Sequence, residues 1–444
     1  MTNNESIEFL YDLAKKNSIE IEVIQISGKS NSVSFLEKKL EEISIGEDFS
    51  LGVRLVKDQK EVFFSSETSK KEDLEKLFNQ QAEALQFAKA NENILLNDKI
   101  ESSGDIEAYF PEQINSDQKV ERTKELEELL WACDENLKKV RNTSFSESYS
   151  NVSLYNKLGD SNSYQKSYYS LSSELLGEKD GKRASGHFSF TTHDYDDMIT
   201  NEMFVDRIKK HSLGLLGAKS PETGDYPIVF ERKAFASLLS LLLPMLNADT
   251  VDQGFSLFDK KQGEKIASGL LHIENDPSYY KGLGRKPFDG EGNPTKKHCI
   301  IQDGVLNSFF SNNEYSKKLG IENTHTASRS GNGRVGISPS NIIVRSGTLA
   351  TTAIKAMKPS LIEIVRLNGL HAGFNSVTGD FSFQAEGFLY DFGNLVNPLQ
   401  DFLVAGNIKD ILMGIEDLGA NVIDNGGSII CPDVLISSLK IIGS

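Results

Sequence analysis

Residues 145–192 read FSESYSNVSLYNKLGDSNSYQKSYYSLSSELLGEKDGKRASGHFSFTT, and this stretch decides the fold class. It predicts three strands, at 145–155, 163–173 and 183–192. Two polar clusters separate them, LGDS at 158–161 and EKDG at 178–181, and both have the composition of tight turns. Short turns join antiparallel strands, and a helix is expected next, over 197–216.

The first 140 residues show the same order of strands followed by helices. Ile19, Ile21 and Val23 alternate with glutamates, and apolar residues alternate over 49–55, which predicts strands with one wet face. A turn then leads into a hairpin partner over 61–65. The expected helices are 6–16, one that follows a capping box at 69–72, and 116–140. Two rounds of antiparallel strands and helices favour an α+β fold over a doubly wound parallel sheet.

A polar connector, KSPETGDY at 219–226, separates the two halves and predicts domains at 1–222 and 223–444. The helix expected over 232–246 is apolar nearly all round, which indicates full burial, and Pro244 should end or kink its last turn. Further expected elements are a strand around 381–385, a helix over 400–418 and a strand-like run over 429–442. The second domain is therefore expected to be sheet-rich with one buried helix.

The composition is that of an acidic globular protein. The chain has 444 residues, 38% of them hydrophobic, and 48 basic against 64 acidic side chains give a net charge of −16. Such a surface repels phosphate backbones and anionic lipids, so we expect neither nucleic-acid nor membrane binding. The most apolar stretch, 234–246, spans only ~20 Å as a helix, whereas a bilayer core needs ~30 Å. Three cysteines without a CxxC pair, and no leader-like N-terminus, predict a cytoplasmic protein.

The histidines and carboxylates do not form a legible metal site. None of the seven histidines belongs to an HExxH or HExxxH motif, and His187 and His193 lack a carboxylate partner. We interpret these two as ordinary surface or rim histidines. The run DGEGN at 289–293 begins like a calcium loop, but its closing position is Ile300, so a tight surface loop is expected.

Nucleotide-binding and nucleophile motifs are equally incomplete. The run GNGRVG at 331–336 lacks the preceding strand and following helix of a dinucleotide site, and we interpret it as a mobile glycine loop. Cys299 adjoins His298 on an expected strand, which places the two side chains on opposite faces. Cys299 and Cys431 are therefore read as core cysteines. Taken alone, the residues favour a binding or assembly role.

Three blocks of the C-terminal half resemble a known family. They are 254–320, 373–388 and 404–419, and their signatures are DPS (276–278), GLG (282–284), PFDGEG (287–292), VTGDFSFQAEGF (377–388) and AGN (405–407). Together they resemble the TldD/PmbA family, and specifically its PmbA (TldE) branch. The N-terminal half is similar in layout, including the run LGVRLV at 51–56.

The resemblance implies one subunit of a paired, cytoplasmic zinc peptidase that cuts small or unfolded peptides. In that family the TldD-type subunit carries HExxxH on a helix of its second domain. The corresponding helix here is 232–246, which offers Ser237 and Ser240 but no histidine, glutamate or aspartate. The resemblance therefore implies a chain with no catalytic residue, metal ligand or cofactor of its own, whose TldD-like partner holds the zinc.

One peptide-contacting element is predicted, the strand over 380–386. Asp380, Ser382, Gln384 and Glu386 alternate with apolar residues beside a glycine-rich loop. An extended peptide would add to the edge of this strand through backbone hydrogen bonds. An ordinary core strand is the alternative interpretation of the same alternation.

Two other functions stay open. One is an autonomous hydrolase with an unrecognised site that uses His187, His193 or Cys431. The other is a non-enzymatic regulator that acts through protein contacts alone. A two-fold homodimer could form when the partner is absent, because related subunits can use one surface for both contacts. The family has also been labelled a modulator of DNA gyrase, but a net charge of −16 argues against direct DNA contact.

Overall fold

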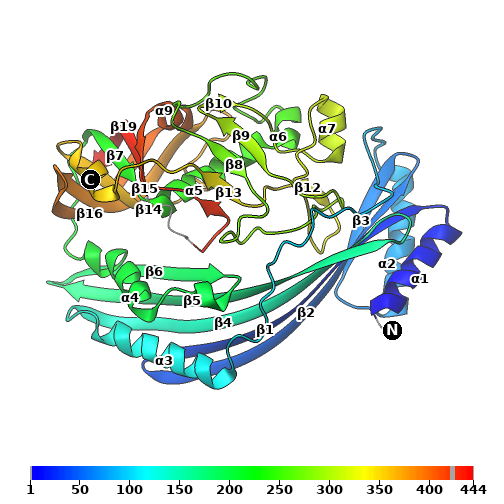
Figure 1. Cartoon of the computed structure of the whole chain (residues 1–444), viewed down its shortest axis with the longest axis horizontal. Helices are drawn as coiled ribbons and strands as arrows, with labels where there is room; N and C mark the ends of the chain where they lie inside the picture. Colours follow the sequence, from blue (N-terminus) through cyan, green and yellow to red (C-terminus); the bar gives the residue numbers. More distant parts are fainter. Residues whose placement is uncertain (1–2, 421–425, 444) are drawn as a thin grey trace.

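The chain folds into a long curved sheet and a second, compact lobe that faces it (Figure 1). The computed structural model describes residues 3–420 and 426–443. The long sheet has the strand order β3-β2-β1-β4-β5-β6, and every neighbouring pair is antiparallel. Its strands are β1 (Glu20–Leu36), β2 (Lys39–Lys57), β3 (Lys60–Ser66), β4 (Leu137–Tyr155), β5 (Ser161–Lys179) and β6 (Lys182–Thr192).

The two predicted rounds of strands join into this one sheet. β1 of the first round pairs with β4 of the second, from Val23 opposite Tyr155 to Phe35 opposite Thr143. The predicted strands and the hairpin are confirmed, although most strands are longer than expected. Alternate residues of β5 from Ser167 to Gly177 are buried, and the other face of the sheet turns toward the lobe (Figure 1).

Helices cover one face of the long sheet in two groups. α1 and α2 form one apolar cluster with β1 to β3, and α3 and α4 form another with β4 to β6. These helices are α1 (Asn3–Lys16), α2 (Lys71–Ala84), α3 (Ser116–Ala132) and α4 (Asn201–Lys210). Within residues 3–420 and 426–443, no helix has the length and apolarity needed to cross a lipid bilayer.

Three sequence expectations about these helices are corrected. α3 ends at Ala132 rather than at 140, because the Asp134 carboxylate accepts a hydrogen bond from the Asn136 backbone (3.0 Å) and turns the chain toward β4. The helix expected over 197–216 is α4 followed by a short 3-10 turn. The capping box at 69–72 is wrong, since the cap of α2 is Lys70, whose side chain makes no capping bond.

The C-terminal lobe is built on a second six-stranded sheet of order β16-β15-β14-β7-β19-β17, and β16 also pairs with β19, which closes the sheet on itself. Its strands are β7 (Gly224–Phe230), β14 (Leu361–Asn368), β15 (Asp380–Asp391), β16 (Asn394–Asn407), β17 (Ile415–Leu418) and β19 (Val434–Gly443). The α+β class predicted from the sequence is confirmed.

A smaller sheet of order β10-β9-β8-β13-β18 and a hairpin of β11 and β12 complete the lobe. These strands are β8 (Ile273–Asn275), β9 (His298–Gln302), β10 (Val305–Leu306), β11 (Ala327–Arg329), β12 (Val335–Ile337), β13 (Ile342–Val344) and β18 (Ile429–Ile430). Short helices between strands are α6 (Ala248–Asp252), α7 (Asn313–Leu319), α8 (Thr351–Ala356) and α9 (Ile408–Met413).

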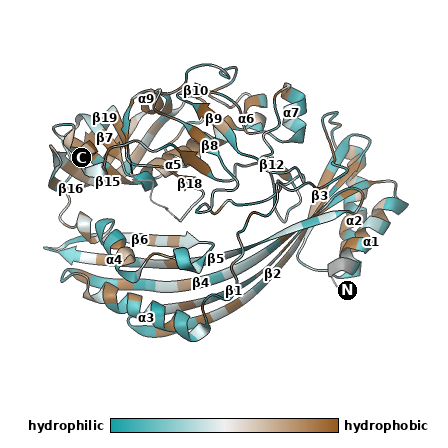
Figure 2. Cartoon of the chain, in the orientation of Figure 1, coloured by the Kyte–Doolittle hydropathy of each residue, from teal (hydrophilic) through white to brown (hydrophobic). Residues whose placement is uncertain are grey.

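The apolar helix predicted over 232–246 lies in the core of the lobe. α5 (Arg232–Leu242) continues as a 3-10 turn through Leu246, with Pro244 inside that turn, as predicted. Its apolar face packs against β7 and β14 in the largest hydrophobic cluster, and Figure 2 shows apolar residues gathered around it. Burial is not complete, because Ser240 on the other face is exposed.

The late helix expected over 400–418 is wrong. β16 extends to Asn407 because Phe402 and Val404 alternate inward and pair with β15. Asn407 then caps the short helix α9, its side chain accepting a hydrogen bond from the Lys409 backbone (3.0 Å). The strand-like run over 429–442 is β18 and β19, interrupted before Val434. The domain boundary at 222 stays a prediction.

Candidate functional site

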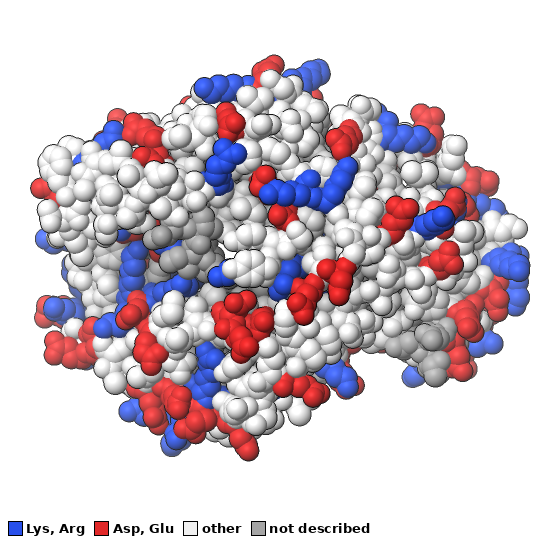
Figure 3. Space-filling view, in the orientation of Figure 1, with Lys and Arg blue, Asp and Glu red and all other residues white. Residues whose placement is uncertain are grey.

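A cleft between the long sheet and the lobe is the candidate site. It consists of two adjoining hollows of about 220 and 230 Å³ whose walls share Pro339 and Ser340. The sheet-side cavity lies between β1, β4, β5 and loops of the lobe, and the helix-side groove lies beside Ser240 of α5. We call both hollows together the interlobe cleft. Figure 3 shows the molecule hollowed between sheet and lobe, with acidic and basic side chains intermixed around it.

The loop 287–293 forms one wall of the sheet-side cavity. Phe288 packs against Ile24 and Leu154 of the long sheet. Asp289 is buried because its carboxylate accepts backbone hydrogen bonds within the loop, from Glu291 (2.9 Å) and from Asn293 (3.0 Å). The expected surface loop is therefore wrong, since these carboxylates anchor the lobe to the sheet instead of facing water.

A buried ion network fixes this anchor. Arg329 of β11 pairs with Glu22 of β1 at 3.1 Å, and Arg54 of β2 pairs with the same carboxylate at 3.3 Å. Arg54 also bonds to Glu61 at 2.8 Å. Each guanidinium has a carboxylate partner, as buried charges require. Burial, together with the charge of Asp289, raises the pKa of Glu291.

A second buried network joins α4 to the lobe. Glu363 of β14 is inaccessible to solvent and pairs with Lys355 (2.7 Å) and Lys210 (3.0 Å). Glu231, before α5, pairs with His211 at 3.3 Å and with Lys210 at 3.5 Å. Burial alone would raise the pKa of Glu231, but the hydrogen bond from His211 and the charge of Lys210 lower it to about 2. This network holds α5 against α4.

The lowered pKa of Glu231 predicts a specific acid sensitivity. Its folded value of about 2 lies below the ordinary 4.5, so its stabilisation is complete above pH 4.5 and is lost as the pH falls toward 2. The Glu231→Gln variant should unfold more easily at pH 7 by on the order of 2 kcal/mol. Thermal unfolding of the wild-type protein and the variant, measured between pH 7 and 3, should show the difference in their stabilities narrowing below pH 4.5. A gap that stays constant would contradict the prediction.

A zinc ion, which the resemblance places on the TldD counterpart of α5, does not fit the side chains here. Ser237 donates to the Lys233 carbonyl (2.9 Å) and Ser240 to the Ser237 carbonyl (2.7 Å), so both hydroxyl protons serve the helix itself. Cys431 is buried, its thiol points at the Arg232 carbonyl (3.2 Å), and burial raises its pKa. The residues described contain no group of three or more histidine, cysteine, aspartate or glutamate side chains that could hold a metal.

The predicted peptide-contacting strand is β15, and its expected free edge is wrong. β15 pairs with β16 over 380–385. On its other side Gln384 and Glu386 pair with β14, while Asp380 and Ser382 form backbone hydrogen bonds with the segment 373–375. Asp380 accepts hydrogen bonds from Thr378 and Asn407, and Glu386 pairs with Arg366 at 2.9 Å. Backbone addition of a peptide is thus blocked within this strand. Contact through the exposed side chains of Asp380, Ser382 and Gln384, or through Glu386, stays a prediction.

The interpretation of His187 and His193 as surface or rim histidines is wrong for His193. His187 is exposed on β6, whereas His193 is buried and its Nδ1 lies 2.7 Å from the Ser167 carbonyl oxygen. Burial lowers the pKa of His193 to about 4, so its ring is neutral at pH 7. Cys299 is half-buried with its sulfur 3.7 Å from His272, not from His298. Burial raises the pKa of this thiol, which argues against a reactive thiolate.

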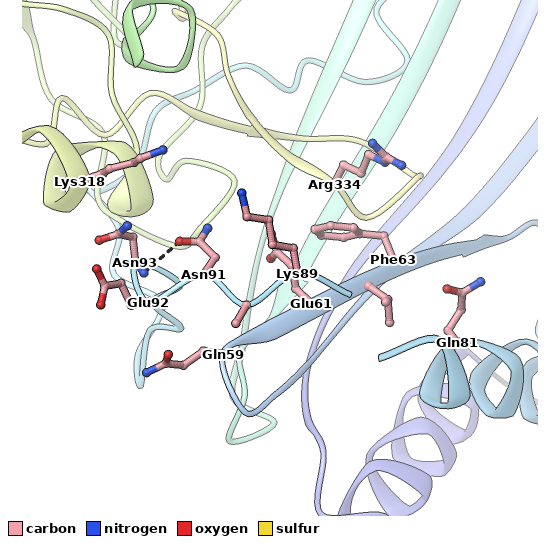
Figure 4. Close-up of a pocket in the computed structure, with 12 residues that line it drawn as sticks. Gln59, Glu61, Phe63, Gln81, Lys89, Asn91, Glu92, Asn93, Lys318 and Arg334 are labelled. Carbon is pink, nitrogen blue, oxygen red and sulfur yellow. Dashed lines mark hydrogen bonds between the residues drawn. The ribbon is translucent and has the colours of Figure 1, made fainter. Parts of the chain in front are cut away.

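The glycine run 331–336 is a hairpin turn packed on the long sheet. A side chain at Gly52 would lie 2.4 Å from the Gly333 backbone nitrogen, so the two backbones are in close contact. The expected mobile loop is therefore held in place. Beside it, between β3 and α7, opens a wider hollow of about 850 Å³ (Figure 4). Two of its charged side chains pair with residues outside it: Glu61 with Arg54, and Lys318 with Asp252 at 2.6 Å.

Sequence reasoning missed three side chains of the sheet-side cavity. They are Lys166 of β5, Lys286 of the loop before Phe288, and Ser340 after β12. A single lysine in an alternating strand is typical of a solvated face. The only signal was the position of Lys286 next to PFDGEG, a signature of the family resemblance.

Comparison with known families gives the class of protein first: three stretches match metallopeptidase domains. Residues 21–85 match the PmbA/TldA metallopeptidase domain 1, residues 109–216 the central domain, and residues 223–443 the C-terminal domain. The chain belongs to the TldD/PmbA family, as its signatures indicated.

Similar proteins span the whole chain. Metalloprotease PmbA of Escherichia coli O157:H7 is 24% identical over 99% of this chain and 96% of its own length. A PmbA homolog of Haemophilus influenzae is 22% identical with the same coverage. Among solved structures, a Thermotoga maritima protein named as a candidate modulator of a DNA gyrase superposes with a TM-score of 0.88 at 25% identity, covering 99% of this chain and all of its own. TldE from Thermococcus kodakarensis superposes with a TM-score of 0.87 at 20% identity, with equal coverage.

Proposed function

We propose that this chain is a PmbA/TldE-type subunit that pairs with a TldD-like zinc peptidase and acts on small or unfolded peptides in the cytoplasm. Family membership and the metalloprotease names of its relatives support the peptidase context. The observation that carries the non-catalytic role is α5, which borders the interlobe cleft with Ser240 and presents no zinc-ligand side chain. The partner would supply the zinc and the activated water, and this chain would help to enclose the peptide.

Mixing experiments test this proposal. The purified chain should contain far less than one zinc per molecule and should not cleave unfolded peptides. A TldD-like relative with HExxxH should cleave them at least tenfold faster when this chain is added, and a chelator should abolish the activity. A relative whose motif is changed to AAxxxA, mixed in the same way, is the matched control. Stoichiometric zinc in this chain alone would overturn the proposal.

The alternative functions make different predictions in the same assay. Cleavage by this chain alone that survives chelation would favour an autonomous hydrolase, although the burial of Cys431 and of His193 argues against two of its candidate residues. If no zinc-bearing relative becomes more active when this chain is added, a non-enzymatic regulator is favoured. Light scattering of the chain alone tests the homodimer.

A further inference from the structure

Two lysines at the sheet-side cavity have no carboxylate partner. Lys166 and Lys286 both line this cavity, and within the described residues neither ammonium group forms an ion pair or a hydrogen bond. The Lys166 ammonium lies 5.4 Å from the centroid of the Tyr164 ring. The buried arginines nearby differ in this respect, because Arg54 and Arg329 each form an ion pair with Glu22. Two unpaired lysines in one cavity indicate that an anion bound from solution forms ion pairs with them.

The electrostatics of the cavity agree with this geometry. Burial, together with the charges of Lys286 and Arg285, lowers the pKa of Lys166 to about 7. Burial also lowers the pKa of Lys286, against the opposing charge of Asp289. A bound anion would reverse both effects.

The other charged groups of the cavity are already engaged. The Asp289 carboxylate accepts hydrogen bonds from the backbone N–H groups of Glu291 and Asn293 and, at 3.2 Å, from that of Ala327. The Arg329 guanidinium bonds to Glu22. The Asp289 charge therefore offsets the burial of Lys286 only in part, and Arg329 is held by Glu22.

A buried hydroxyl and an apolar wall complete the cavity. Ser340 is 5% exposed and its hydroxyl oxygen has no hydrogen-bond partner, which is unusual for a buried polar atom. Apolar side chains also line the cavity: Ile24, Val152, Leu154 and Phe288. At about 220 Å³ the cavity exceeds the ~150 Å³ that holds a benzene molecule, so it accommodates one medium-sized side chain with its carboxylate.

We propose that the sheet-side cavity binds the free C-terminal carboxylate of a peptide whose last residue is apolar. The carboxylate would lie between Lys166 and Lys286 and accept a hydrogen bond from Ser340, while the last side chain lies against Phe288. Because Pro339 and Ser340 are shared with the helix-side groove, the rest of the peptide would run toward α5. This inference deepens the proposed function and rests on it for the identity of the ligand as a peptide.

Binding of paired peptides to the full chain, without a zinc partner, tests the proposal. A hexapeptide of glycine and serine that ends in leucine, labelled at its N-terminus, is compared as free acid and as C-terminal amide by fluorescence anisotropy at pH 6.5. We expect the acid to bind at least tenfold more tightly. The Lys166→Met/Lys286→Met variant should reduce the affinity for the acid to that for the amide. The matched control is Lys138→Met, an exposed lysine at the start of β4, which should leave the preference unchanged.

Further peptides and a competitor separate the sources of the anion. An amide that carries an internal aspartate should bind no better than the plain amide, and 1 mM phosphate should not displace the acid. Equal binding of acid and amide, equal binding of the aspartate amide and the acid, or displacement by phosphate would each overturn the proposal. Circular dichroism checks that the variants are folded. The binding measurement does not depend on proteolysis. The preference for the free acid can therefore be absent while the mixing experiment shows activity, or be present while the mixing experiment shows none.

Discussion

Replacing Arg329 by alanine should destabilise the protein by about 3 kcal/mol or more. The Arg329 side chain is inaccessible to solvent, pairs with the Glu22 carboxylate at 3.1 Å and donates to the Glu22 carbonyl at 3.2 Å. It also donates to the Gly333 carbonyl at 3.1 Å, which closes the hairpin packed on β2. Its removal leaves a buried carboxylate with one cation fewer. Loss of a partner from a buried pair costs far more than the pair contributes when intact.

Denaturant unfolding followed by tryptophan fluorescence and circular dichroism measures this loss. Trp131 is the only tryptophan and lies on α3, so circular dichroism is needed to report on the lobe. The matched control is Arg183→Ala, because Arg183 pairs with Glu178 at 2.7 Å while 71% exposed. Exposed pairs contribute about 0–1 kcal/mol. If both variants lose equal stability, the buried network does not anchor the lobe.

The long sheet could be predicted from sequence because its strands carry local signals. Alternating apolar residues appear in several of its strands, and the polar clusters at 158–161 and 178–181 mark two of its hairpins. The pairing of β1 with β4 could not be predicted, because more than 100 residues separate the paired positions Val23 and Tyr155. Apolar alternation predicts which side chains of a strand face the core, but it does not predict which strand lies beside it in the sheet.

The burial of Asp289 and Glu291 shows the main limit of local inference. Two acidic residues among glycines are typical of an exposed turn. What buries them is tertiary structure: the Phe288 ring enters a cluster with Ile24 and Leu154, and distant backbone N–H groups satisfy the carboxylates. The motif alone contains none of these partners.

The prediction of a helix over 400–418 was wrong for a similar reason. The run that follows Gln400 contains good helix formers, but Phe402 and Val404 pair with β15, and tertiary pairing overrides propensity. For the candidate site, the sequence indicated α5 through its apolar character and its lack of ligand residues. It did not indicate Lys166, because only the folded lobe shows that this lysine faces a cavity.

Replacing Glu363 by alanine should have the second large effect, a loss of about 3–5 kcal/mol. Glu363 is inaccessible to solvent and is the shared partner of Lys355 (2.7 Å), Lys210 (3.0 Å) and the Tyr390 hydroxyl (3.1 Å). Without it, the largely buried Lys355 loses its only carboxylate among the described residues, while Lys210 keeps Glu231 at 3.5 Å. The penalty should therefore come mainly from the unpaired charge of Lys355.

A double variant separates this penalty from lost packing. Glu363→Met/Lys355→Met removes both charges while keeping apolar volume, so it should recover most of the stability that Glu363→Met loses, since buried pairs replaced by apolar groups are often neutral. Urea unfolding of the single and double variants gives the coupling energy. Glu322→Ala, whose partner Lys296 is 43% exposed, is the control and should lose less than about 1 kcal/mol. If the double variant is as unstable as the sum of the single variants, packing rather than an uncompensated charge explains the loss.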